Sequence, residues 1–392
     1  MSKMTLTGKG RRWLTTGHPW VYSDDLAGGE AEAGELVPVE DPSGKVVGWG
    51  LFSGHSKIAV RMVSKGEVQP TRDFWAARMA AALARREEHG LLDPEGACRL
   101  VSGDADGFPG MVIDRYGTTA VLQSGAQGSD RMRDFIVELL EEALPYELTA
   151  VVDRSDSSVR KHEGLEPRTE TLKGEVTGPI LVREGQVEYE VDVFQGHKTG
   201  AYLDQRDNRL RAAQYAKDED VLDAFSYDGL FALQAAMAGA KSVTCLEQNA
   251  HARERLLASA ERNGVADRIT AIKANCMQEL RDRADKKEVY GLVIVDPPAF
   301  ARSRKEASGA ERGYVELNRR AADLIRPGGH LVSASCSYNV RSQDFTQYIT
   351  KGAALAGREM RLVEMRGASP DHPYLLSLPE SHYLKCAFLR VD

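Results

Sequence analysis

Two strings in the last third of the chain hold side chains that could do covalent chemistry. Cys336 lies between two serines at the end of the apolar segment 330–336, and Asp296 ends another apolar segment in the string VIVDPPAF at 293–300. A thiolate can add to carbon 6 of a pyrimidine and so activate carbon 5 for methylation, whereas an amine, a hydroxyl or a purine ring nitrogen needs no such step. The two prolines predict a rigid extended turn that presents Phe300. Phe300 could stack on a base drawn out of its helix, and Asp296 could address the polar edge of that base.

Each of these residues also has a plain structural interpretation. A buried cysteine usually serves as a small apolar side chain, and we expect this for Cys98, Cys245 and Cys386. A proline-stiffened loop with its phenylalanine in the core is the structural alternative for the DPPAF string. The position of both strings at strand ends favours function.

The string DAFSYDG at 223–229 and the acid Glu247 suggest a cofactor site. The string carries one glycine, whereas a dinucleotide-binding loop carries three to let the backbone approach a pyrophosphate. Glu247 follows Asp223 by 24 residues and could bind both hydroxyls of a ribose, although an exposed acid at a strand end would look the same. Together they favour a cofactor with an adenosine and no pyrophosphate, and S-adenosylmethionine fits.

These residues require a parallel sheet to bring them to one edge. From residue 219 onwards, short apolar segments alternate with amphipathic ones, which predicts a doubly wound parallel sheet with ligands at the carboxyl ends of its strands. The predicted strands are 221–225, 242–247, 269–274, 291–296 and 330–336, the helices are 229–239, 251–264, 277–284 and 313–325, and 327–329 is a turn.

The rest of the chain predicts two smaller domains. Short, glycine-punctuated strands at 35–41, 45–53 and 57–64 suggest a β-barrel within residues 1–70. Residues 71–185 read as a mixed α+β domain, followed by a third domain at 186–392. The middle domain is predicted to contain helices at 72–89 and 130–144 and strands at 98–102, 110–114 and 119–123, and a hairpin at 179–193 leads into the third domain.

The composition and net charge of the chain indicate which classes of binding partner to expect. The 392 residues are 42% hydrophobic and 28% charged, as in ordinary globular proteins, and the net charge of -7 taken alone argues against a nucleic-acid partner. Positive charge is nevertheless concentrated locally. Five cysteines without a C-x-x-C pair predict reduced thiols, no metal site and a cytosolic location, and the sequence shows neither a secretory signal nor a membrane span. The candidate RNA contacts are Lys9, Arg11 and Arg12 near Trp13 and Trp20, and Arg302, Arg304 and Lys305 after Phe300.

A set of strings resembles one enzyme family. GHKTGAYLDQRDNRL (196–210), LDAFSYDGLFAL (222–233), VDPPAF (295–300), SCS (335–337) and DHP (371–373) are similar, in order and spacing, to the 23S ribosomal RNA cytosine-5 methyltransferases of bacteria and archaea. KGRRWLTTGHPWVYS (9–23) resembles the opening of that family's PUA RNA-binding domain. The resemblance covers essentially the whole chain. It implies an α/β fold in which a doubly wound, Rossmann-like class I methyltransferase sheet follows a small α+β domain and a PUA-like barrel.

The resemblance also implies roles for single residues. Cys336 matches the nucleophile, and Asp296 matches the acid beside ring nitrogen 3 and the transferred methyl group. Related uracil-5 enzymes carry a base near the C-terminus, for which Glu380, His382 and Lys385 are candidates here, besides Asp296. The implied S-adenosylmethionine contacts are Tyr202, Gln205, Arg206, Phe225, Ser226, Tyr227, Gly229, Glu247, Asn275 and Asp296.

Four alternatives remain open from the sequence. A uracil-5 methyltransferase would use the same thiol chemistry, and a guanine-N7 methyltransferase would share the DPP strand without needing Cys336. A non-catalytic RNA-binding assembly factor could retain the cofactor pocket, and a dehydrogenase is disfavoured by the missing glycines. A homodimer is possible.

Overall fold

The computed structural model describes residues 2–300 and 307–392. The chain divides into two compact units. The first unit comprises the residues up to Val182 together with Val191–Leu203 and Pro370–Ser381. The second comprises Arg183–Glu190, Asp204–Ser369 and His382–Asp392.

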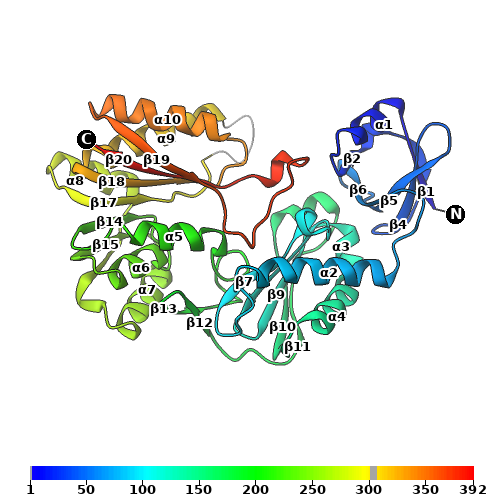
Figure 1. Cartoon of the computed structure of the whole chain (residues 1–392), viewed down its shortest axis with the longest axis horizontal. Coiled ribbons are helices and arrows are strands. Elements are labelled where there is room, and N and C mark those ends of the chain that lie inside the picture. The colour runs from blue at the N-terminus through cyan, green and yellow to red at the C-terminus, as the bar shows by residue number, and fades with distance from the viewer. Residues whose placement is uncertain (1, 301–306) are drawn as a thin grey trace. The chain divides into compact units, whose positions relative to one another are not determined.

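The first unit begins with a six-stranded, mainly antiparallel sheet in the order β2-β6-β5-β4-β1-β3 (Figure 1). Alternate residues of β4 are buried, so one face of the strand packs into a small apolar core. The bounds are β1 (Lys3–Leu6), β2 (Trp20–Tyr22), β3 (Leu26–Glu30), β4 (Leu36–Glu40), β5 (Val46–Phe52) and β6 (Ile58–Lys65).

A helix that the sequence reasoning did not foresee carries the basic N-terminal string. Helix α1 (Gly8–Thr15) begins because the Thr7 hydroxyl accepts a hydrogen bond from the Gly10 N–H at 3.0 Å. Lys9, Arg11 and Arg12 are therefore helical residues and do not belong to a strand or loop of the barrel.

A second sheet of the first unit has the order β11-β10-β9-β8-β7 and packs against α2 and α4. The single helix expected over 130–144 is two helices that meet at Met132. The bounds are α2 (Arg72–Glu87), β7 (Ala97–Ser102), β8 (Met111–Tyr116), β9 (Thr119–Ser124), α3 (Gln127–Arg131), α4 (Arg133–Ala143), β10 (Ala150–Ser155) and β11 (Arg168–Lys173).

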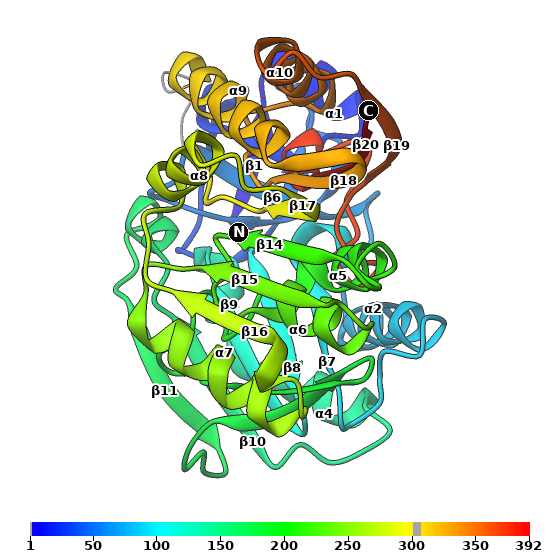
Figure 2. The ribbon, with the colours of Figure 1, turned by 90° about the vertical axis from the view of Figure 1, so that its left-hand side faces the viewer.

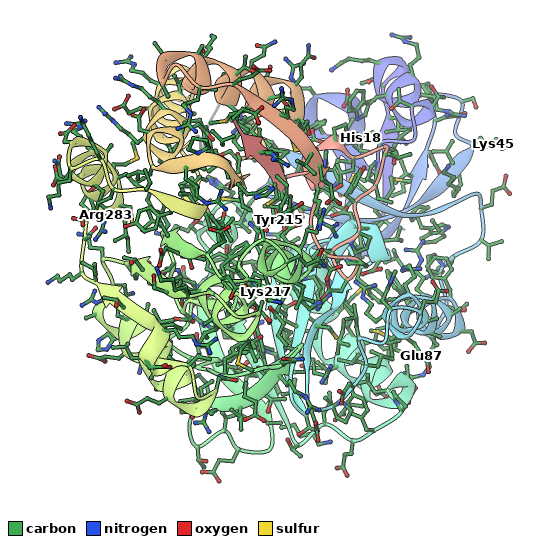
Figure 3. The ribbon with its side chains drawn as sticks, turned by 60° about the vertical axis from the view of Figure 1, so that its left-hand side comes forward. His18, Lys45, Glu87, Tyr215, Lys217 and Arg283 are labelled. Carbon is green, nitrogen blue, oxygen red and sulfur yellow. The ribbon has the colours of Figure 1, made fainter. Side chains whose placement is uncertain are left out.

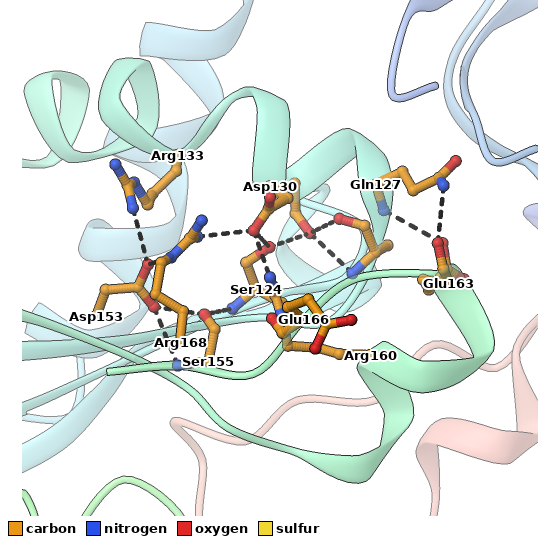
Figure 4. Close-up of polar contacts among 12 residues, drawn as sticks. Ser124, Gln127, Asp130, Arg133, Asp153, Ser155, Arg160, Glu163, Glu166 and Arg168 are labelled. Atoms are coloured by element: carbon orange, nitrogen blue, oxygen red, sulfur yellow. Dashed lines mark hydrogen bonds and ion pairs between the residues drawn. The ribbon is translucent and has the colours of Figure 1, made fainter. Parts of the chain in front are cut away.

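Buried and partly buried ion pairs join segments of the first unit. Asp130 accepts hydrogen bonds from Arg160 at 2.8 Å and Arg168 at 2.7 Å (Figure 4). Glu163, which accepts from the Gln127 N–H at 3.2 Å, also pairs with Arg61 of β6 at 2.7 Å. The Arg61–Glu163 pair therefore joins the six-stranded sheet to the segment that follows β10.

The second unit is built on a seven-stranded sheet in the order β16-β15-β14-β17-β18-β20-β19 (Figure 2). The first five strands are parallel, which confirms the doubly wound arrangement, whereas β20 is antiparallel to both β18 and β19. The bounds are β14 (Asp220–Ala224), β15 (Ser242–Leu246), β16 (Ile269–Ile272), β17 (Tyr290–Val295), β18 (Ile325–Ser335), β19 (Met360–Arg366) and β20 (Lys385–Val391).

Two details of this sheet differ from the sequence prediction. The sheet is mixed, because β19 and β20 form an antiparallel pair. The alternation of strands and helices in the sequence did not predict this pair. The expected turn 327–329 lies inside β18, where the pairing with β17 shifts register between Tyr290 and Leu292. A bulge therefore takes up the glycines that the sequence reasoning assigned to a turn.

Helices cover both faces of the sheet (Figures 1 and 2). Side chains of α8, α9 and α10 join the strands in one apolar core, and all six residues of β17 are buried. Tyr215, which Figure 3 labels, stacks on His330 of β18 with 4.1 Å between ring centroids. The bounds are α5 (Arg206–Ala213), α6 (Leu230–Met237), α7 (Ala250–Arg262), α8 (Cys276–Asp285), α9 (Ala307–Asp323) and α10 (Ser342–Leu355), and a hairpin of β12 (Ile180–Glu184) and β13 (Val187–Val191) precedes them.

No helix among the described residues is long and apolar enough to cross a membrane.

Candidate active site

The loop after β14 has a strained backbone. Phe225 and Tyr227 have positive φ angles of 64° and 49°, which side chains other than glycine rarely adopt. Their neighbour Gly229, at φ 72°, has no room for a Cβ atom, which would lie 1.9 Å from a methyl carbon of Leu256. Such strain is kept where the surrounding structure enforces it, and it concentrates at ligand sites.

Glu247 lies directly after β15 and is fixed by that loop. One carboxylate oxygen accepts a hydrogen bond from the Tyr227 N–H at 2.9 Å, and the other accepts from the Asn249 N–H at 2.7 Å. Each oxygen keeps a second lone pair, so the carboxylate can still accept two hydrogen bonds from a ligand. Two adjacent hydroxyl groups, as in a ribose, match this geometry.

Two buried polar atoms beside the loop are available to bind a ligand. Among the described residues, nothing hydrogen-bonds to Asp223 Oδ2 or to Ser226 Oγ. Burial raises the pKa of Asp223 well above its usual value, and the negative charges of Asp296 and Glu247 raise it further. A cationic ligand with hydroxyl groups fits such a site, and S-adenosylmethionine has both a sulfonium and a ribose.

Asp296 follows β17 at the carboxyl edge of the sheet. Its Oδ2 accepts a hydrogen bond from Gln205 Nε2 at 2.9 Å, and Gln205 is only 3% exposed. Gln205 is oriented in turn by Asn208, whose amide donates to Gln205 Oε1 at 2.6 Å. The adjacent Arg206 is buried and pairs with Asp207 at 3.3 Å. The string LDQRDN thus supplies the residue that orients Asp296.

Cys336 follows β18, the parallel neighbour of β17, and Val295 pairs with Ser333. Asp296 and Cys336 therefore leave the same edge of the sheet from adjacent strands. All five cysteines are free thiols, and Cys336 alone is partly exposed.

The serines that flank Cys336 are held by one tyrosine of α9. The Ser335 hydroxyl donates to the Tyr314 hydroxyl at 2.8 Å, and Tyr314 shares a 3.2 Å hydrogen bond with Ser337. Burial raises the pKa of Tyr314 to about 12, so it stays neutral and can both donate and accept. Sequence reasoning missed Tyr314 because nothing in its own helix shows which strand end it will contact.

Three predicted ligand residues have structural roles as well. Asn275 caps α8, because its Oδ1 accepts from the Gln278 N–H at 3.2 Å, so its amide nitrogen is the atom left for an adenine. Phe300 packs edge-on against Tyr314 with 4.8 Å between centroids. Tyr202 belongs to the first unit, where its hydroxyl bonds His197 Nδ1 at 3.1 Å.

The candidate proton-abstracting bases differ in the unit to which they belong and in their surroundings. Glu380 belongs to the first unit and pairs with His18 at 3.5 Å. Lys385 is buried and donates hydrogen bonds to two backbone carbonyl oxygens. Burial and the charge of Lys385 lower the pKa of His382, which favours the neutral ring that a base requires. Asp296, His382 and Lys385 belong to the second unit with Cys336, and the identity of the base stays a prediction.

The basic residues proposed to contact RNA are partly described. On α1, the Lys9 ammonium lies 3.0 Å from Asp25 with 71% of its side chain exposed, and Arg12 is exposed. Arg302, Arg304 and Lys305 lie outside the described residues. Within residues 2–300 and 307–392 no group of three or more His, Cys, Asp and Glu side chains could hold a metal ion.

This mixed seven-stranded sheet, with an acid after its second strand and a thiol beside a carboxylate at its carboxyl edge, has the architecture of a class I methyltransferase. The sequence comparisons agree. Residues 156–377 match the family described as S-adenosylmethionine-dependent methyltransferase, and residues 4–65 match the PUA-like domain.

Relatives cover almost the entire chain. Ribosomal RNA large subunit methyltransferase I of Shewanella denitrificans is 38% identical over 97% of both chains. The protein of the same name from Alteromonas mediterranea is 37% identical over 94% of this chain and 93% of its own. The chain therefore belongs to the S-adenosylmethionine-dependent methyltransferase family and groups within it with these proteins. It is an enzyme that uses S-adenosylmethionine.

Solved structures share the fold along the full chain. A structure described as a methyltransferase complexed with SAH has a TM-score of 0.85 at 22% identity, and both chains are covered completely. A SAM-dependent methyltransferase from Streptococcus mutans has a TM-score of 0.84 at 21% identity with the same coverage. These likenesses confirm the predicted fold class.

Proposed function

We propose that this enzyme methylates carbon 5 of a cytosine in large-subunit ribosomal RNA and that Cys336 is the nucleophile. The names of the relatives support the RNA substrate. One observation carries the choice of ring carbon: the partly exposed thiol of Cys336 leaves the sheet beside Asp296, and methylation of an amine or a ring nitrogen would not need it.

The residues at the sheet edge account for each bond change. The Cys336 thiolate forms a bond to carbon 6, and the electron pair of the carbon 5–carbon 6 double bond moves to carbon 5. S-adenosylmethionine would supply the electrophilic methyl group that carbon 5 takes up, with the C–S bond of its sulfonium breaking and S-adenosylhomocysteine as the leaving group. Asp296 holds the polar edge of the base, with Gln205 fixing the carboxylate. Removal of the carbon 5 proton, by His382 or Asp296, restores the double bond and breaks the bond to sulfur, which returns as thiolate.

The proposed contacts with the cofactor lie at the same carboxyl edge of the sheet. Glu247 would bind the ribose hydroxyls, and the Phe225–Gly229 loop with Asp223 would enclose the rest of the cofactor. Tyr202, Gln205, Arg206 and Asn275 remain proposed contacts.

RNA would be held by the N-terminal sheet and α1 through Lys9, Arg11 and Arg12. Domain boundaries at 70 and 185, a role for Phe300 in stacking, the basic string 302–305, a cytoplasmic location and a homodimer all stay predictions.

The test is methyl transfer to undermethylated large-subunit RNA, with nucleosides identified by mass spectrometry. We expect 5-methylcytosine from the wild type and none from Cys336→Ala, which should still bind SAH. Cys98→Ala is the matched control, because Cys98 is buried in the first unit and the chemical change is the same. Appearance of 5-methyluridine or N7-methylguanosine would reassign the substrate, and full activity of Cys336→Ala would refute the covalent route.

A further inference from the structure

We propose that Lys385 is a positioning residue of this enzyme: its buried ammonium group fixes the backbone that carries Cys336 and favours the thiolate form of that thiol. The consequence for turnover rests on the proposed function, whereas the effect on the thiol can be measured without RNA.

The placement of Lys385 follows from the antiparallel end of the sheet. Lys385 begins β20 and pairs directly with Ser335, the last residue of β18 before Cys336. It is 1% exposed. Its Nζ donates hydrogen bonds to the carbonyl oxygens of Ser337 at 2.6 Å and Tyr383 at 2.8 Å. The lysine thus ties the residue after Cys336 to β20.

A lysine is rarely buried to this degree without a partner charge. The two groups that accept hydrogen bonds from its Nζ are backbone carbonyl oxygens, which carry no net charge. Burial lowers the pKa of Lys385 to about 8, and the charged form is favoured by Cys336 first and by Asp344 of α10 second. Because electrostatic interaction is reciprocal, an ammonium that is stabilised by the Cys336 thiolate stabilises that thiolate equally.

Four other titratable groups that the structure describes in this part of the second unit do not supply this positive charge. Tyr314 of α9 is neutral, with a pKa raised to about 12 by burial. Asp296 and Asp344 are acids and oppose thiolate formation. The lowered pKa of His382 keeps its ring neutral. Of these described groups, Lys385 is therefore the one that carries a positive charge near neutral pH.

The same contacts argue against Lys385 as the proton-abstracting base. A base must present a lone pair to carbon 5, whereas Lys385, with a pKa of about 8, is mostly an ammonium near neutral pH, and two of its three N–H bonds are directed at backbone carbonyl oxygens. Its part in the reaction is to prepare the nucleophile.

The test is the rate of Cys336 alkylation by iodoacetamide, followed by peptide mass spectrometry from pH 5.5 to 9.5 in the full chain without RNA. The other four thiols are buried, and Cys336→Ser sets the background. We expect a wild-type thiol pKa below the ordinary value of about 8.5. Lys385→Met keeps the length and volume of the side chain without its charge, and it should raise that pKa by about 1 unit. Alkylation at pH 7 would then be roughly tenfold slower.

Lys385→Gln separates the two roles, because its amide can still donate to the Ser337 carbonyl but carries no charge. We expect it to slow alkylation as Lys385→Met does. SAH binding by calorimetry checks that each variant is folded. A wild-type thiol pKa at or above 8.5 would overturn the proposal whether or not the variants fold, as would an unchanged pKa in a folded Lys385→Met. A shifted thiol pKa without RNA methylation would instead refute only the proposed function.

Discussion

The exchange Glu247→Gln tests the cofactor site most directly. In the wild type, both carboxylate oxygens accept backbone hydrogen bonds, from Tyr227 at 2.9 Å and Asn249 at 2.7 Å, so the group cannot turn away from the ligand. Glutamine has the same shape but offers one oxygen and one N–H₂ group. One of the two backbone N–H groups would then face another donor, and the negative charge toward the ribose would be lost.

The size of the effect follows from the two hydrogen bonds that Glu247 would make to the ribose. A hydrogen bond to a charged acceptor is worth about 1 kcal/mol more than one to a neutral acceptor, so the two together lose about 2 kcal/mol. This corresponds to a roughly 30-fold weaker Kd.

Calorimetric titration of SAH into the full chain measures this change. Glu261→Gln is the matched control, because Glu261 is exposed on α7 and the change in charge is the same. The control should bind SAH as the wild type does. A Glu247→Gln protein that binds within threefold of the wild type would refute the ribose assignment. Equal weakening in Glu261→Gln would show that net charge alone is responsible.

Two further predictions concern the first unit. Arg61→Ala leaves Glu163 buried without its partner and should lower the free energy of unfolding by about 3–5 kcal/mol near pH 7, measured by urea denaturation. Burial raises the pKa of Glu163, but Arg61 together with hydrogen bonds from Ser53 and Ser56 outweighs burial and lowers that pKa. The ionised carboxylate therefore stabilises the fold above the unfolded pKa of about 4.3, and the stability deficit of Arg61→Ala should shrink as the pH falls below that value. Arg131→Ala, which breaks an exposed pair, should cost less than about 1 kcal/mol, and an equal loss would contradict this reasoning. Arg11→Ala combined with Arg12→Ala should reduce the slope of log Kobs against log salt for single-stranded RNA by about 1.4, and an unchanged slope would exclude α1 from the interface.

Local patterns were sufficient to predict much of the second unit. Buried strands such as 291–296 show as apolar runs, and the helices between them show a period near 3.6. The strand order and the carboxyl edge then follow from the doubly wound rule, which is why Asp296 and Cys336 could be placed on neighbouring strands in advance. The antiparallel pair β19 and β20 was not predicted, because it interrupts that alternation. Helix α1 was not predicted either, because its eight residues include two glycines and show little apolar periodicity.

The chemistry of the candidate residues was a property of the sequence, but their surroundings were decided by the tertiary structure. Glu380 and Lys385 lie five residues apart in one string, and residue type alone made both candidates for the same role. In the structure Glu380 pairs with His18 in the first unit. Lys385, in contrast, is buried at the start of β20 and donates a hydrogen bond to the carbonyl oxygen of Ser337, the residue after Cys336. Burial and charge partners set the pKa and the free lone pairs of a side chain, and both come from residues far away in the chain. The sequence by itself therefore determined which atoms could react, and only the packing of distant segments decided the burial and the charge partners of each.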